Sequence, residues 1–138
     1  MAKTVLIDSG PIVAALRRRD QYHSWARAHF ESSTESFATC EAVISESHFL
    51  LEGIPGGADA LHSLLQRGII KLPFSLTSEL AETTRLIRRY RDVPISLADA
   101  CLIRMAELDE DAVVFTTDSD FRIYRRNGRQ VIPLVMPS

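Results

Sequence analysis

Residues 4–11 read Thr-Val-Leu-Ile-Asp-Ser-Gly-Pro, and this stretch decides the fold. The apolar, partly β-branched run over residues 4–7 predicts a short buried strand. Pro11 is favoured in the first turn of a helix, so we expect a helix from there to about Arg18. A strand that passes directly into a helix is typical of α/β proteins, and it leaves Asp8 at the carboxyl end of the strand.

The rest of the chain continues this alternation between short apolar runs and helical spacing. We predict that Asp20 and Thr39 cap helices over residues 20–30 and 39–53, and that a fourth helix follows residues 54–57 and ends at Gly68. Further predicted helices span 76–90 and 96–108, and further strands span 36–38, 69–72, 112–116 and 131–134. Strands separated by helices pair in parallel through right-handed crossovers. We therefore expect one domain over residues 1–138, an α/β protein with four or five mostly parallel strands in a three-layer α/β/α sandwich.

The composition is that of an ordinary globular protein of 138 residues, with 46% hydrophobic residues and a net charge of −2. Its two cysteines, Cys40 and Cys101, are far apart in sequence, and no CxxC pair or Cys/His cluster indicates a zinc site. The longest apolar run, residues 12–16, is far too short to cross a membrane. We expect a soluble, cytoplasmic protein with no membrane association.

Fourteen of the sixteen basic residues are arginines, and most of them gather in three clusters. The clusters lie at residues 17–19, 85–91 and 122–129. Guanidinium groups bind phosphates and carboxylates well, but charged runs also form ordinary solvated helix faces. The clusters alone leave both interpretations open.

Two aspartates follow predicted strands. Asp8 comes directly after Ile7, and Asp118 comes after the apolar and threonine run of residues 112–117. Ligands of open parallel sheets bind beyond the carboxyl ends of the strands, so both carboxylates are candidate functional groups. The competing interpretation for each is a loop aspartate that stabilises a turn or caps a helix.

Two further acids lie within apolar helical patterns. Glu46 and Asp99 each have apolar neighbours at helical spacing, namely Ala42, Val43, Phe49 and Leu50 for the first, and Ile95, Leu102 and Ile103 for the second. A carboxylate on the buried face of a helix is seldom unpaired. Asp99 also has a local alternative, because Ser96 and Asp99 match a capping box at the start of a helix.

Taken together, the four carboxylates favour a metal site. An ionised carboxylate on an apolar face needs a cation or a shared proton, and no lysine lies nearby in sequence. Oxygen ligands alone favour Mg²⁺ or Mn²⁺ over zinc. A hydrated ion of this kind can orient a phosphodiester and activate water, so the pattern indicates metal-dependent phosphodiester hydrolysis.

These residues resemble the ordered acidic motifs of the PIN domain family. The resemblance rests on Asp8 after the first strand, Glu46 in Glu-x-x-x-Leu-Leu, Asp99 in Ser-x-x-Asp-Ala, and Thr-Thr-Asp-Ser-Asp-Phe at residues 116–121. The compact length and residues 39–46 resemble the VapC-type toxins within that family. The resemblance implies a Mg²⁺- or Mn²⁺-dependent endoribonuclease that acts on RNA, forms a homodimer and is inhibited by a small antitoxin in the active-site groove.

The resemblance also implies roles for individual residues. Asp8 and Asp99 would be the principal metal ligands, with Glu46 and Asp118 completing the catalytic pocket directly or through water. Four residues would position the substrate or the acids. They are Ser9 and Ser96 as hydrogen-bonding groups, Thr116 at the start of the last motif, and Asp120, which can share or replace the role of Asp118.

Other classes fit the sequence less well. A phosphoacceptor receiver domain needs a lysine late in the fold, whereas this chain has only Lys3 and Lys71. A haloacid-dehalogenase-like phosphatase needs a second aspartate two residues after the first, where this chain has Gly10. The remaining alternative is a noncatalytic PIN-like module that binds RNA or a protein partner, and the four intact acids argue against it because they would repel phosphates.

Overall fold

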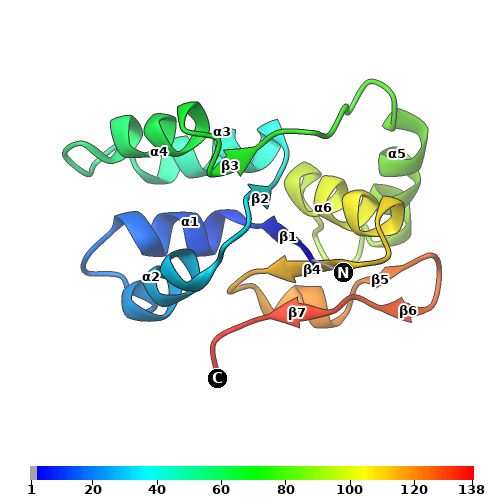
Figure 1. The fold of residues 1–138 in the computed structure, drawn as a ribbon. Coiled ribbons are helices and arrows are strands. Elements are labelled where there is room, and N and C mark those ends of the chain that lie inside the picture. The colour runs from blue at the N-terminus through cyan, green and yellow to red at the C-terminus, as the bar shows by residue number, and fades with distance from the viewer. Residues whose placement is uncertain (1–2) are drawn as a thin grey trace.

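The computed structural model describes residues 3–138 and has a parallel β-sheet at its centre (Figure 1). The strands are β1 (Thr4–Ile7), β2 (Phe37–Ala38), β3 (Ile70–Lys71), β4 (Ala112–Phe115) and β7 (Leu134–Val135). They lie in the order β3-β2-β1-β4-β7, and every neighbouring pair is parallel. The sheet therefore confirms the predicted α/β class and its mostly parallel pairing.

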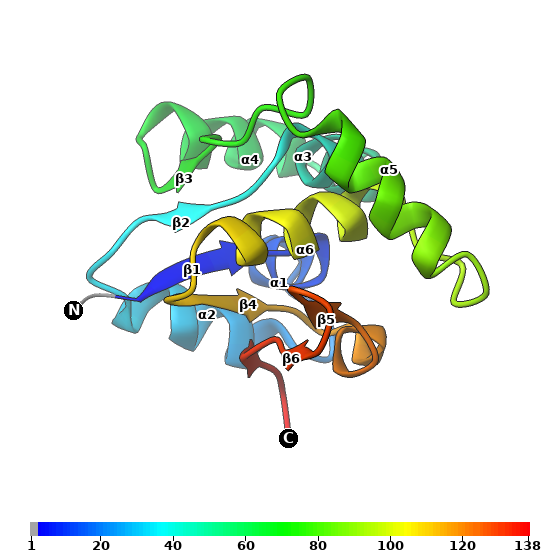
Figure 2. The same ribbon diagram turned by 90° about the vertical axis from the view of Figure 1, so that its right-hand side faces the viewer.

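Within residues 3–138, six α-helices pack around the sheet. They are α1 (Ser9–Leu16), α2 (His23–Ser32), α3 (Glu41–Leu50), α4 (Gly57–Gln66), α5 (Leu80–Arg89) and α6 (Leu97–Leu108). Figure 2 shows α2 on one side of β1 and β4 and α6 on the other, which gives the predicted three layers. None of the helices within residues 3–138 is long and apolar enough to cross a membrane.

Aromatic side chains join α2 to the sheet. The rings of Trp25 and Phe115 meet edge to face with centroids 5.0 Å apart, and those of Phe30 and Phe37 lie 4.6 Å apart. Contacts of this geometry add to the stabilisation from apolar burial. Phe115 ends β4, so this packing fixes the strand end that precedes the last acidic motif.

The starts of two helices are determined by side-chain caps. Asp8 is the N-cap of α1 and accepts a hydrogen bond from the Ser9 N–H at 2.8 Å, so the helix begins two residues before Pro11. Ser96 is the N-cap of α6 and its hydroxyl accepts from the Asp99 N–H at 3.0 Å. Both capped helix starts therefore carry a candidate acid.

The other two predicted caps are wrong. The Asp20 carboxylate accepts from the Tyr22 N–H at 2.8 Å, and α2 begins only at His23. The Thr39 hydroxyl donates to the carbonyl of Ile7 at 2.7 Å, and α3 begins at Glu41 after Cys40. In both cases a different hydrogen bond satisfies the side chain, so the backbone enters the helix later.

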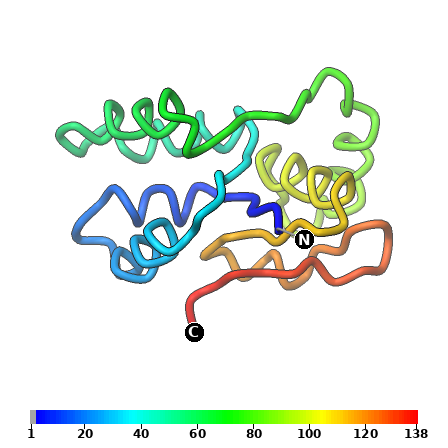
Figure 3. The backbone as a smooth tube through the Cα atoms, in the orientation of Figure 1, coloured from blue at the N-terminus to red at the C-terminus, as the bar shows by residue number. Residues whose placement is uncertain are grey.

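The predicted last strand over residues 131–134 is also wrong, because Pro133 lies between two separate strands. β6 (Gln130–Val131) pairs antiparallel with β5 (Arg125–Arg126), whereas β7 joins the main sheet. Asn127 and Gly128 have positive φ values of 50° and 85°, which these two residue types tolerate in a tight hairpin connection. The trace in Figure 3 shows this hairpin beside α6, and the two are in contact.

Candidate active site

The carboxyl ends of the two central strands meet at one edge of the sheet. Ile7 pairs with Phe115, so Asp8 and Thr116 are the next residues on adjacent strands. The Thr116 hydroxyl donates to Oδ2 of Asp8 at 2.6 Å. Figure 2 shows β1 and β4 pointing toward the side where α1 and α6 begin and where the short helix η1 (Ser119–Arg122) lies. The topology thus gathers the acidic motifs at a single edge.

Asp8 is the most buried of the four acids, with only 5% of its surface exposed. Its pKa is raised to about 6, mainly by burial and further by the charges of Asp99 and Glu46. The hydrogen bonds from Thr116 and from the Ser9 N–H act in the opposite direction. Asp8 is therefore a carboxylate crowded by two other acids, an environment in which a cation is stabilising.

Glu46 reaches this edge from α3. Its Oε1 accepts a hydrogen bond from the hydroxyl of Ser9, the residue next to Asp8. The predicted apolar surroundings of Glu46 are partly wrong, because Phe49 is 68% exposed and Leu50 is 43% exposed, while Val43 is fully buried. Glu46 is half-buried at the boundary of the core, and Ser9 connects it to the site.

Asp99 has the capping environment that the sequence predicted and also lies near another candidate acid. It lies in the first turn of α6 beside its cap, Ser96, and its Oδ2 accepts from the hydroxyl of Tyr124 at 3.0 Å. Its pKa is raised, first by burial and then by the charge of Asp118, against the hydrogen bonds from Tyr124 and Ser96. The capping geometry is present, and the carboxylate also belongs to the group of neighbouring acids Asp8, Glu46, Asp99, Asp118 and Asp120, which we call the acidic pocket.

The last motif wraps around Thr116 in a chain of hydrogen bonds. The Thr116 Oγ1 accepts from the Asp118 N–H at 3.0 Å, and Oδ1 of Asp118 accepts from the Asp120 N–H at 2.9 Å. Asp118 is also the N-cap of η1. Both aspartates act electrostatically on Tyr124, so the structure brings both to this pocket.

Tyr124 is a pocket residue that the sequence did not reveal. It is fully buried, its ring lies 5.1 Å from that of Tyr90 and 5.2 Å from that of Phe121, and its hydroxyl contacts Asp99. Burial raises its pKa, and the neighbouring charge of Asp99 raises it further, so the hydroxyl stays protonated as a donor. Around Tyr124, the sequence pattern drew attention only to the nearby arginines, such as Arg122 and Arg125, and not to the tyrosine itself.

The donor set fits a hydrated divalent cation. No three His, Cys, Asp or Glu side chains within residues 3–138 converge as a ready-made metal cluster. Mg²⁺ commonly takes one or two carboxylates and keeps several waters, so it needs no such cluster. The pKa values of Asp8 and Asp99 are raised mainly by burial and further by neighbouring carboxylates, and the candidate acids all offer oxygen donors.

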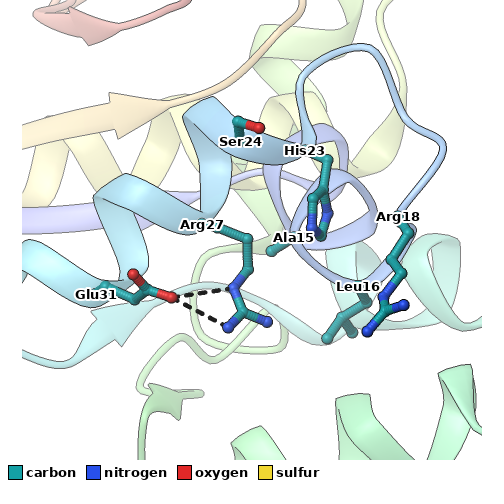
Figure 4. A pocket seen from close by; sticks show the side chains of 7 residues that line it. All are labelled: Ala15, Leu16, Arg18, His23, Ser24, Arg27 and Glu31. Carbon is teal, nitrogen blue, oxygen red and sulfur yellow. Dashed lines mark hydrogen bonds and ion pairs between the residues drawn. The ribbon is translucent and has the colours of Figure 1, made fainter.

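A separate hollow of about 440 Å³ lies between the end of α1 and α2 (Figure 4). Its only carboxylate, Glu31, forms an ion pair with Arg27 at 3.1 Å. None of the acids described above lines it. The lining residues are Ala15, Leu16, Arg18, His23, Ser24, Arg27 and Glu31. This hollow is therefore distinct from the acidic pocket.

The central parallel sheet and the acids gathered beyond the carboxyl ends of β1 and β4 indicate which class of protein this chain belongs to. The family model of the PIN domain matches residues 5–127, and the chain belongs to the PIN domain family. The fold is similar to the crystal structure of VapC20 from Mycobacterium tuberculosis, a sarcin-ricin loop cleaving toxin, with a TM-score of 0.76 and 17% identity. The match covers 85% of this chain and 92% of that one, and at this identity it shows the fold alone. No curated protein matches the sequence significantly.

Proposed function

We propose that this protein is a metal-dependent endoribonuclease that hydrolyses RNA phosphodiester bonds. The observation that carries the proposal is the buried, hydrogen-bonded Asp8, whose pKa is raised to about 6 beside Glu46 and Asp99 in a PIN domain. A carboxylate held in this way at the end of a parallel strand is a functional-site candidate on physical grounds. The proposed domain comprises residues 1–138.

In the proposed site, Asp8 and Asp99 are direct ligands of Mg²⁺ or Mn²⁺, and Glu46 and Asp118 complete the pocket directly or through water. A cation bound there would supply positive charge to the phosphodiester and acidify a coordinated water. Because Asp8 has a pKa of about 6, it is mostly ionised at neutral pH and able to bind a cation. Below that pH protons compete for the same oxygens.

The surrounding side chains hold the acids in place. Thr116 fixes Oδ2 of Asp8, and Ser9 fixes Glu46 through its hydroxyl. Ser96 positions the first turn of α6, and Asp120 either supports Asp118 or takes over its role. Each of these residues is proposed to position a reacting group rather than to react itself.

We further propose that the protein is the toxin of a toxin-antitoxin pair, that it works in the cytoplasm and that it forms a homodimer. The similarity in fold to a sarcin-ricin loop cleaving toxin supports the toxin part of this proposal. An anionic pocket also attracts a basic side chain, so an antitoxin that inserts an arginine could take the place of the cation.

The decisive experiment measures cleavage of structured and single-stranded RNA with Mg²⁺, with Mn²⁺ and with excess EDTA. We expect cleavage only with a divalent metal, and we expect Asp8→Asn to abolish it. The matched control is Asp59→Asn, the same change at an exposed position of α4, which should leave the rate unchanged. Cleavage that continues in EDTA would contradict the proposal, and RNA binding without cleavage would favour a noncatalytic module.

The antitoxin proposal has its own test. A small protein encoded beside this chain should co-purify with it when the two are expressed together, and it should suppress the cleavage. If it does neither, the toxin assignment fails while the nuclease assignment stands.

A further inference from the structure

Four exposed arginines lie on the side of the molecule formed by α5, η1 and the β5–β6 hairpin. Arg88 lies in the last turn of α5, Arg91 follows the end of that helix, Arg122 ends η1, and Arg129 lies in the hairpin. None of them forms an ion pair within residues 3–138, whereas other arginines on α5 and α6 do. We refer to these four residues as the basic rim.

Two hydrogen bonds fasten the end of α5 to the hairpin. The Arg89 guanidinium donates to the carbonyl of Gly128 at 2.6 Å, and the Arg125 N–H donates to the hydroxyl of Tyr90 at 2.9 Å. The Arg89 guanidinium also lies 5.1 Å from the centre of the Tyr90 ring, within range of a cation–π contact. The two segments that carry most of the basic rim are therefore neighbours in space, although about forty residues of sequence separate them.

The same contacts lead from the basic rim to the acidic pocket. The ring of Tyr90 packs against Tyr124, whose hydroxyl contacts Asp99. Arg122 belongs to η1, the short helix capped by Asp118. Arg122 and the end of α5 therefore lie on the side of the proposed metal ligands, whereas the hairpin with Arg129 extends toward the other end of α6, where the Asn127 N–H donates to Glu107 at 2.8 Å.

This neighbourhood meets a physical requirement of the proposed function. RNA is a polyanion, and four carboxylates in one pocket repel it, while the net charge of −2 gives no general attraction. Exposed guanidinium groups bind phosphate oxygens without reading the base sequence. We infer that the basic rim binds backbone phosphates of RNA on the α5 and hairpin side of the acidic pocket and thereby holds the strand beside the acids. This inference rests on the proposed nuclease function.

The chain contains a matched control for this surface. Arg17, Arg18 and Arg19 are also exposed and unpaired within the described residues, but they follow the end of α1 that lies away from Asp8. The triple variants Arg88→Gln/Arg91→Gln/Arg129→Gln and Arg17→Gln/Arg18→Gln/Arg19→Gln change the net charge equally. Only the first removes arginines from the basic rim.

The test measures binding of a short, fluorescein-labelled single-stranded RNA by anisotropy, in EDTA and over a series of KCl concentrations. Each phosphate contact to a single strand contributes about 0.7 to the slope of log Kd against log salt. Loss of three contacts should make that slope shallower by about 2 and weaken binding roughly 100-fold at 0.1 M salt. The variant Arg88→Lys/Arg91→Lys/Arg129→Lys keeps the charges and should keep the wild-type slope.

The inference is overturned if the basic-rim variant keeps the wild-type slope, or if the Arg17–Arg19 variant weakens binding as much. If each variant has the same melting temperature as the wild type, misfolding is excluded as the cause of a loss of RNA binding. The lysine variant provides a second folded comparison. Cleavage assays keep the two proposals distinct. If the wild type cleaves RNA and the basic-rim variant binds RNA as well as the wild type does, this inference alone is refuted. If the wild type neither binds nor cleaves RNA, the nuclease proposal is refuted as well.

Discussion

Replacing Asp8 with asparagine should stabilise the metal-free protein at neutral pH, although we expect the same change to abolish the proposed nuclease activity. The pKa of Asp8 is raised from 3.8 to about 6 in the folded state, so folding favours its protonated form. Above pH 6 the carboxylate is ionised in both states, and this difference corresponds to a destabilisation of about 3 kcal/mol. The penalty develops as pH rises from 3.8 to 6, because in that window the folded state binds more protons than the unfolded state.

The asparagine variant removes this penalty but rearranges the hydrogen bonds from Thr116 and Ser9. We assign about 1 kcal/mol to that rearrangement, which leaves a net gain of about 2 kcal/mol. For a chain of this length the gain corresponds to a rise in Tm of about 6 °C in EDTA at pH 7.5. At pH 4 most of the gain should be absent.

Saturating Mg²⁺ should reverse the order of the two proteins. Binding to the native state alone stabilises the wild type by about 2.7 kcal/mol at a metal concentration 100 times Kd, and the variant should gain much less. Thermal melts of wild type, Asp8→Asn and the exposed control Asp59→Asn, each with EDTA and with Mg²⁺ across pH 4–7.5, measure all these effects. If Asp8→Asn melts below the wild type in EDTA by an amount that does not change with pH, crowding at Asp8 is refuted.

Three other substitutions test neighbouring parts of the structure. Thr116→Val removes the hydrogen bond that most lowers the pKa of Asp8, so the acid limb of the pH–rate profile should move to higher pH, while Thr116→Ser should keep the wild-type profile. Asp99→Asn should raise the Tm in EDTA and reduce the difference between the Tm values measured in EDTA and in Mg²⁺. If Asp99 served only as a cap, the same change would lower the Tm under both conditions. Arg126→Met leaves the carbonyls at the end of α6 without their buried donor and should cost about 2–4 kcal/mol in urea titrations, against no change for the exposed control Arg67→Met.

The alternation of strands and helices was predictable because it depends on local patterns. The run at residues 4–7 and the buried run at residues 112–115 have strand composition wherever they lie, and Pro94 followed by Ser96 indicates a helix start within a few residues. Parallel pairing then follows from the intervening helices. These local signals were sufficient to predict a sheet of four or five mostly parallel strands and its three layers.

The errors have two different causes. Thr39 has the composition of a cap, but its hydroxyl donates to the carbonyl of Ile7, which lies 32 residues earlier in the chain, so a distant partner decides the outcome. The run at residues 131–134 is apolar, but Pro133 within it divides the run between a hairpin and the main sheet.

The acidic pocket shows the same division between local and distant information. The position of Asp8 at a strand end follows from its own neighbours in sequence, whereas its elevated pKa depends mainly on burial in the folded structure and further on acids that lie 38 and 91 residues away, Glu46 and Asp99. Tyr124 was missed because its partner, Asp99, precedes it by 25 residues and belongs to a different element. The same tyrosine packs against Tyr90, which accepts the backbone hydrogen bond that positions the arginine-rich hairpin. One buried aromatic pair therefore connects the acids proposed to bind metal with the arginines proposed to bind phosphate, so a change that displaces this pair should affect metal affinity and RNA affinity together.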